Sequence, residues 1–73
     1  MQEGGLSTAA IHRLIRKAGA ARVGDDAVEE LRKVLEELGV RIGKEAMELA
    51  THARRKTVKS DDIRLAVKRV THE

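Results

Sequence analysis

The chain has 73 residues, so it can form one small domain at most, and a domain of this size buries only about 60% of the surface of its unfolded chain. It contains no cysteine, which excludes disulfides and cysteine–zinc sites, and no Phe, Tyr or Trp on which unpaired bases could stack. The net charge is only +3, but the 15 lysine and arginine residues are unevenly distributed along the chain.

The start of the chain has no targeting pattern. No apolar run approaches the ~20 residues of a membrane span, and residues 1–7 lack the basic start and apolar stretch of a signal peptide. We therefore expect a protein inside the cell with no membrane contact. Residues 1–6 predict a short flexible tail, and residues 7–73 a single domain.

The first predicted helix covers about residues 8–18. Ser7 is a good N-cap because its hydroxyl can accept a hydrogen bond from a free N–H group of the first turn. Apolar residues such as Ile11 and Leu14 recur at steps of three and four, which is the helical period. Gly19 is well placed to end this helix in a left-handed conformation.

The second predicted helix is long and runs from about Asp25 to Ala53 without a strong break. A helix of about 28 residues is roughly 40 Å long, so two short helices of the same chain cannot cover its apolar face. We expect a second copy of the chain, or a similar chain, to cover it. Oppositely charged residues four apart, such as Glu29 and Lys33 or Glu37 and Arg41, have the favourable order on its solvated side.

Two glycines, Gly39 and Gly43, lie one turn apart near the middle of this helix. A glycine inside a helix costs about 1 kcal/mol relative to alanine. The cost is explained if another backbone crosses closely there; otherwise these are tolerated surface glycines. The expected crossing comprises Leu35, Leu38, Gly39, Ile42 and Gly43.

A third helix is predicted over about residues 60–71, preceded by a basic connector. Residues 49–60, which we call the second basic zone, contain no acidic residue. Hydroxyl, ammonium and backbone N–H groups in such a connector can bind phosphate, although a charge run can also be merely solvated. The candidates in this zone are Arg54, Lys56, Thr57 and Lys59.

Residues 4–24, the first basic zone, are also free of acidic residues. Arg13, Arg16 and Lys17 share one face of the first helix, and Arg22 lies in the connector that follows it. Two basic zones separated by a mixed segment indicate a molecule with one basic side.

Taken together, these pieces resemble the histone fold, in the short form found in archaeal histones, over about residues 10–70. The segments that carry the resemblance are Ile11-x-Arg13-Leu14-Ile15, Gly19-Ala20-x-Arg22-Val23, Asp25-Asp26-Ala27 and His52-Ala53-Arg54-Arg55-Lys56-Thr57-Val58-Lys59-x-x-Asp62-Ile63-x-x-Ala66. The resemblance implies an all-α fold and an intertwined homodimer whose long helices cross at their middles. It also implies that the first connector of one chain lies beside the second connector of its partner.

The resemblance assigns roles to individual residues. Arg22 is expected to enter the minor groove, steadied by Thr57 of the partner chain. Lys56 and Lys59 are expected to bind phosphates of the DNA backbone. Arg55 and Asp62 match an internal clamp that fixes the second connector; otherwise they are an ordinary surface ion pair. The expected contacts between one dimer and the next are Leu49, His52, Asp62 and Leu65.

The sequence departs from the archaeal pattern in two places. Arginine stands at position 54, where glycine is frequent, and the prolines common near the start of the family are absent, with Ser7 and Ala10 in their place. The arginine adds a charge, and the missing prolines leave the start of the first helix less well defined.

The predicted function is that of a DNA-binding chromatin protein in the cytoplasm, on the chromosome (nucleoid). It should bind, bend or wrap and compact double-stranded DNA with little sequence preference, as a homodimer and then a tetramer or larger assembly. The alternative is a histone-fold module that binds proteins, such as one component of a transcription or repair complex. A helix-turn-helix regulator is least favoured because the central helix is too long.

An enzymatic function is not expected. The three histidines, His12, His52 and His72, have no metal-ligand spacing, and no pairing of a nucleophile with a base is evident. We therefore expect no cofactor, no metal and no small-molecule substrate.

Overall fold

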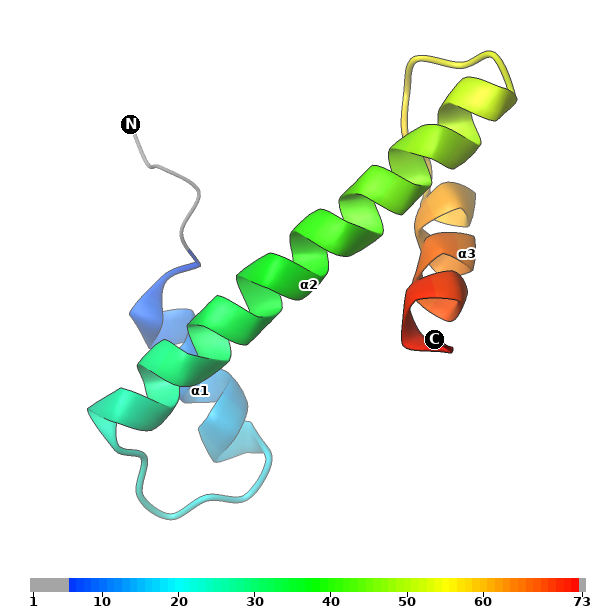
Figure 1. The fold of residues 1–73 in the computed structure, drawn as a ribbon. Coiled ribbons are helices and arrows are strands. Elements are labelled where there is room, and N and C mark those ends of the chain that lie inside the picture. The colour runs from blue at the N-terminus through cyan, green and yellow to red at the C-terminus, as the bar shows by residue number, and fades with distance from the viewer. Residues whose placement is uncertain (1–5, 73) are drawn as a thin grey trace. The chain divides into compact units, whose positions relative to one another are not determined.

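The computed structural model describes residues 6–72, in which the chain forms three helices and no strand. In chain order these are α1 (Thr8–Lys17), α2 (Asp25–His52) and α3 (Ser60–Thr71) (Figure 1). The predicted all-α class and the order of short, long and short helices are confirmed. The predicted tail falls outside the described residues except for Leu6. None of the helices in the described part is long and apolar enough to cross a bilayer.

Both ends of α1 form as the sequence predicts. The Ala10 N–H donates to the Ser7 hydroxyl over 3.0 Å, so Ser7 is the N-cap. At the other end Gly19 has a φ of 113°. The Gly19 N–H donates to the Arg16 carbonyl (2.9 Å) and the Ala20 N–H to the Ile15 carbonyl (3.5 Å). This pair of bonds is a Schellman motif, which satisfies carbonyls that the helix end would otherwise leave free.

The chain divides into two compact units, residues 1–37 and 38–73, and α2 contributes one half to each. In the first unit Ile11 of α1 is 1% exposed and Val28 of α2 is 5% exposed. The Leu6 N–H donates to the Glu36 carboxylate over 3.0 Å. Glu29 forms its ion pair with Arg32, one residue before the Lys33 that stands at the favourable spacing.

The second unit packs α3 against the second half of α2 through small residues. Ala46, Ala50 and Ala66 are at most 2% exposed. Alanines on facing helices let the two backbones approach closely, and an ion pair between Arg69 and Glu45 (2.6 Å) joins the same two helices. This core is compact but contributes little apolar volume.

The end of α2 repeats the motif that ends α1, with a different residue at its left-handed position. The Arg54 N–H donates to the Thr51 carbonyl and the Arg55 N–H to the Ala50 carbonyl, both over 2.9 Å. Arg54 has a φ of 62°. A residue with a Cβ atom costs about 1 kcal/mol or more in this conformation relative to glycine. The helix ends one residue before the predicted Ala53, and the left-handed arginine was not predicted.

Each unit leaves large apolar side chains uncovered. In the described residues only six apolar side chains are buried, and three of them are alanines. Those left exposed include Leu14 and Val34 in the first unit, and Val40, Met47, Val58, Ile63, Leu65 and Val67 in the second. A Cβ atom added at Gly39 or Gly43 would meet nothing within 4 Å. The chain alone therefore does not use the space beside these two glycines.

Candidate nucleic-acid interface

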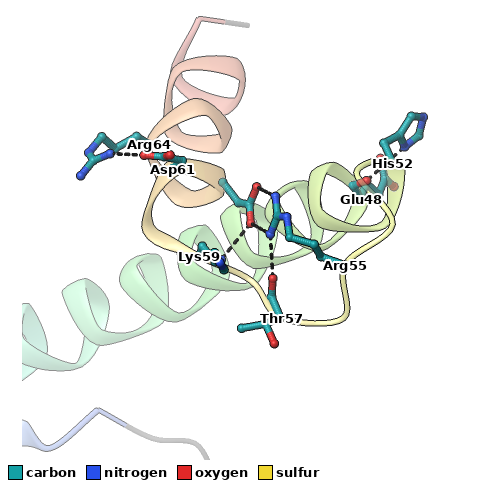
Figure 2. A network of polar contacts seen from close by, with 8 residues as sticks. Glu48, His52, Arg55, Thr57, Lys59, Asp61 and Arg64 are labelled. Atoms are coloured by element: carbon teal, nitrogen blue, oxygen red, sulfur yellow. Dashed lines mark hydrogen bonds and ion pairs between the residues drawn. The ribbon is translucent and has the colours of Figure 1, made fainter.

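A bidentate ion pair fixes the connector between α2 and α3 (Figure 2). The two terminal nitrogens of Arg55 donate to the two carboxylate oxygens of Asp62, over 3.0 Å and 2.9 Å. One of these nitrogens also donates to the Thr57 carbonyl (2.9 Å). The Lys59 N–H donates to the Asp62 carboxylate over 2.8 Å, which caps the start of α3. We call these contacts the Arg55–Asp62 clamp.

The clamp stabilises the ionised form of Asp62. Hydrogen bonds from the Arg55 guanidinium, and then from the Lys59 backbone N–H, lower the pKa of Asp62 to about 2 from an ordinary value of 3.8. The same contact raises the pKa of Arg55. Asp62 is only 5% exposed, so its charge depends on these donors rather than on water.

The clamp holds the backbone of the second basic zone while the cationic side chains stay outside. Lys56, Thr57 and Lys59 are all exposed. Because the Arg55 side chain turns inward to Asp62, its charge is neutralised, and the outward charge of the connector comes from Lys56, Lys59 and Arg54. A connector fixed in this way loses little conformational entropy when it binds a phosphate.

Arg54 differs from its neighbour Arg55. It is exposed, and its side chain forms no hydrogen bond or ion pair with residues 6–72, whereas Arg55 makes three side-chain bonds. Arg54 lines a hollow of about 410 Å³ together with Met47, Ala50, Thr51, Arg55, Lys56 and Val58.

The first basic zone lies in the first unit. Arg13, Arg16 and Lys17 are exposed on α1, and Arg22 is exposed in the connector before α2. Within the described residues none of these four side chains forms a hydrogen bond or ion pair. Arg22 and Thr57 belong to different units, and the pairing expected between them joins two chains of a dimer.

The residues expected between dimers lie on α2 and α3 of the second unit. Leu49 is half-buried, His52 is exposed and Leu65 is 45% exposed. Asp62 differs from the other three, because it is buried and its oxygens already accept bonds from Arg55 and Lys59.

A hollow of about 140 Å³ is lined by Glu48, Leu49, His52 and Arg69. The His52 Nδ1 atom lies 3.1 Å from the Glu48 carbonyl oxygen (Figure 2). Since a carbonyl only accepts, Nδ1 carries a hydrogen, which leaves Nε2 as the acceptor of the neutral ring.

No group of three or more histidine or acidic side chains in residues 6–72 is arranged to hold a metal ion. The arrangement offers exposed cations, a fixed connector and backbone N–H groups, which suit phosphate binding.

Comparison with known proteins agrees with this arrangement. A model of the family described as "Histone-like transcription factor (CBF/NF-Y) and archaeal histone" matches residues 5–67. One of the subunits of archaeal histone HAN1 from Thermococcus zilligii is 59% identical over 63 residues, which are 86% of this chain and 94% of that protein. Probable archaeal histone 3 of Methanocaldococcus jannaschii is 40% identical with the same coverage. The major histone H4 of Tetrahymena pyriformis is 35% identical over 65 residues, which are 89% of this chain and 63% of that protein.

The family match spans most of the chain: it includes α1, α2, both basic connectors and all of α3 except its last residues. The chain therefore belongs to the histone-fold family, among the archaeal histones, a family of DNA-binding chromatin proteins.

Proposed function

We propose that this protein binds double-stranded DNA as a homodimer, through the phosphate backbone and with little sequence preference, and that it bends or wraps the duplex. The observation that carries the proposal is the exposure of two acid-free basic zones, one of which is held in shape by the Arg55–Asp62 clamp. Histones that wrap DNA recognise its backbone and its deformability, so bending needs no base contact.

The composition supports low sequence preference. The chain has no asparagine, and Gln2 is its only glutamine, so the usual amide readers of adenine are absent from the helices. Its arginines and lysines can contact phosphates on any sequence. The proposed DNA contacts are Arg13, Arg16, Lys17, Arg22, Arg54, Lys56, Thr57 and Lys59.

The uncovered apolar side chains support the dimer. Within residues 6–72 a single chain buries six apolar residues, and it exposes Val34, Val40 and Met47 along α2 to water. A second α2 crossing at Gly39 and Gly43 would cover this face and occupy the open space beside both glycines. Leu35, Leu38 and Ile42, all half-buried in the single chain, would then complete the crossing.

Association of dimers would use the exposed face around His52. Leu49, His52 and Leu65 would meet the same residues of a neighbouring dimer, giving a tetramer or a larger assembly on DNA. Asp62 would act there indirectly, by fixing the backbone on which Leu65 stands. The protein would then be located on the chromosome in the cytoplasm.

Binding across a salt series tests the proposal. The affinity for random-sequence duplex should fall steeply with salt, because each neutralised phosphate contributes a slope of about −0.9 to log K against log salt. Lys33→Ala, which removes a charge from α2 outside the proposed site, is the matched control and should change the slope little. Weak binding with no salt dependence would contradict the proposal.

Nuclease digestion of the reconstituted complex tests wrapping separately. Stacked dimers should protect DNA in regular increments, whereas a uniform digest would exclude wrapping. Sedimentation of the free protein measures its mass, and a mass of one chain would exclude the dimer.

The second candidate is a protein-binding component of a larger complex, because the family description also includes histone-like transcription factors. The HAN1 relative is itself named as a subunit, which favours testing for a different second chain. A purified protein that stays monomeric and does not bind duplex would support this candidate.

A further inference from the structure

The left-handed residue that ends α2 is an arginine, where the same motif at the end of α1 has glycine. Gly19 and Arg54 make equivalent backbone bonds, to Arg16 and Thr51 respectively. The φ of 113° at Gly19 and 62° at Arg54 both lie where glycine is favoured. Nothing in the backbone bonds of α2 therefore requires the arginine side chain.

No side-chain bond within the described chain offsets the cost of the left-handed conformation at Arg54. The side chain forms no hydrogen bond or ion pair in residues 6–72, and it is exposed. Strained backbone conformations of this kind concentrate at ligand-binding and other functional sites, so the residue is a candidate for a contact outside the free protein.

The position of Arg54 indicates what that contact is. It precedes Arg55, whose charge is neutralised by Asp62, and it lies two residues before the exposed Lys56. Since no acidic residue occurs from 49 to 60, an anion meets only attraction from the side chains of this segment. The fixed end of α2 also anchors the backbone from which the guanidinium extends.

We propose that Arg54 holds a strained left-handed conformation because its guanidinium there contacts a DNA phosphate, so that this position exchanges stability of the free protein for affinity for duplex. The inference rests on the proposed DNA-binding function. It adds that a glycine at position 54 would give a more stable protein that binds DNA less tightly.

Four substitutions separate the effect of charge from the effect of backbone strain. Arg54→Lys keeps both the charge and the strain, and Arg54→Gln keeps the strain and the aliphatic stem but removes the charge. Arg54→Gly and Arg54→Asn remove the charge and tolerate the left-handed conformation. Thermal unfolding at one protein concentration and binding across a salt series are measured for all five proteins.

The two measurements should sort the variants differently. The glycine and asparagine variants should unfold a few degrees above the wild type, while the lysine and glutamine variants stay near it. The DNA affinity and salt slope of Arg54→Lys should remain near those of the wild type. The glutamine, asparagine and glycine variants should each lose about two units of salt slope, one per chain of the dimer, and several-fold in affinity at moderate salt.

Each failure identifies a different error. If Arg54→Gln binds with the wild-type affinity and slope, the guanidinium contacts no phosphate and the inference is wrong. If the glycine and asparagine variants are no more stable than the wild type, position 54 carries no strain cost and the proposed exchange is wrong. If the wild type itself shows no salt-dependent binding to duplex, the proposed function fails instead.

Discussion

The two connectors begin with the same backbone motif but are stabilised differently. After Gly19 the first connector has no side-chain bond within the described residues that fixes its course before α2. After Arg54 the second connector is held by four bonds of the Arg55–Asp62 clamp. The difference indicates that a single chain preforms its second connector, whereas the side chains of the described residues leave the first connector without such support.

Breaking the clamp should have the largest effect. Asp62→Asn removes the charge that pairs with Arg55 and replaces one of the two accepting oxygens by an NH2 group, so the second connector loses its bidentate ion pair. We expect the Tm to fall by roughly 5–10 °C, because removing one partner leaves the other without its ion pair. Thermal unfolding followed by circular dichroism measures this.

Asp61→Asn is the matched control. Asp61 pairs with Arg64, but the two side chains are 89% and 70% exposed, and an exposed pair contributes little. If both substitutions lower the Tm equally, the clamp does not stabilise the connector.

The first connector should matter more for binding than for folding. Arg22→Ala removes an exposed cation with no partner in the described chain, so the Tm should change little. We expect a loss of about tenfold in DNA affinity and of about two units of salt slope in the homodimer. Fluorescence anisotropy with a labelled duplex measures both.

Arg22→Lys is the control for the shape of the guanidinium. It should restore the salt slope but only part of the affinity, because a planar cation fits a narrow groove better than an ammonium. If Arg22→Lys binds DNA with the full wild-type affinity, Arg22 acts only as a point charge.

The glycine that ends α1 gives a smaller, purely conformational effect. Gly19→Ala places a Cβ atom at a φ of 113° and should lower stability by about 1 kcal/mol, or about 4–8 °C in Tm. Gly19→Asn should lower it less, because asparagine tolerates positive φ better. If Gly19→Ala has the same Tm as the wild type, the end of α1 adjusts to the Cβ atom without a loss of stability.

Acid should weaken the Arg55–Asp62 clamp. The folded pKa of Asp62, about 2, lies below its ordinary value of 3.8. Its contribution is therefore complete above about pH 4 and is lost as the pH falls through about 2. The difference in Tm between the wild type and Asp62→Asn should shrink over this window. A constant difference from pH 5 to pH 2 would contradict the assignment of this charge to the clamp.

Local signals made much of the fold predictable. The Ser7 hydroxyl and the flexibility of Gly19 act within a few residues of their own positions, so the ends of α1 follow from adjacent residues. The contact between Arg55 and Asp62 spans seven residues, and the family resemblance predicted it where no local rule would.

Other features depend on three-dimensional packing. Glu29 has cations three and four residues away, and the choice of Arg32 depends on rotamers that no sequence pattern encodes. The contacts of Leu6 with Glu36 and of Arg69 with Glu45 span 30 and 24 residues. The left-handed Arg54 went unpredicted because arginine is an ordinary helix residue, although the lack of glycine at the end of α2 was the available signal.

The alanine-rich interior of the chain has a consequence for the life of the protein in the cell. Because residues 6–72 bury only six apolar side chains, a single chain without the proposed partner would have little to resist local opening, and opened segments are the substrates of proteases. Newly made chains would then survive in proportion to how quickly they pair. Turnover of the unpaired fraction would limit how much free protein accumulates away from the chromosome.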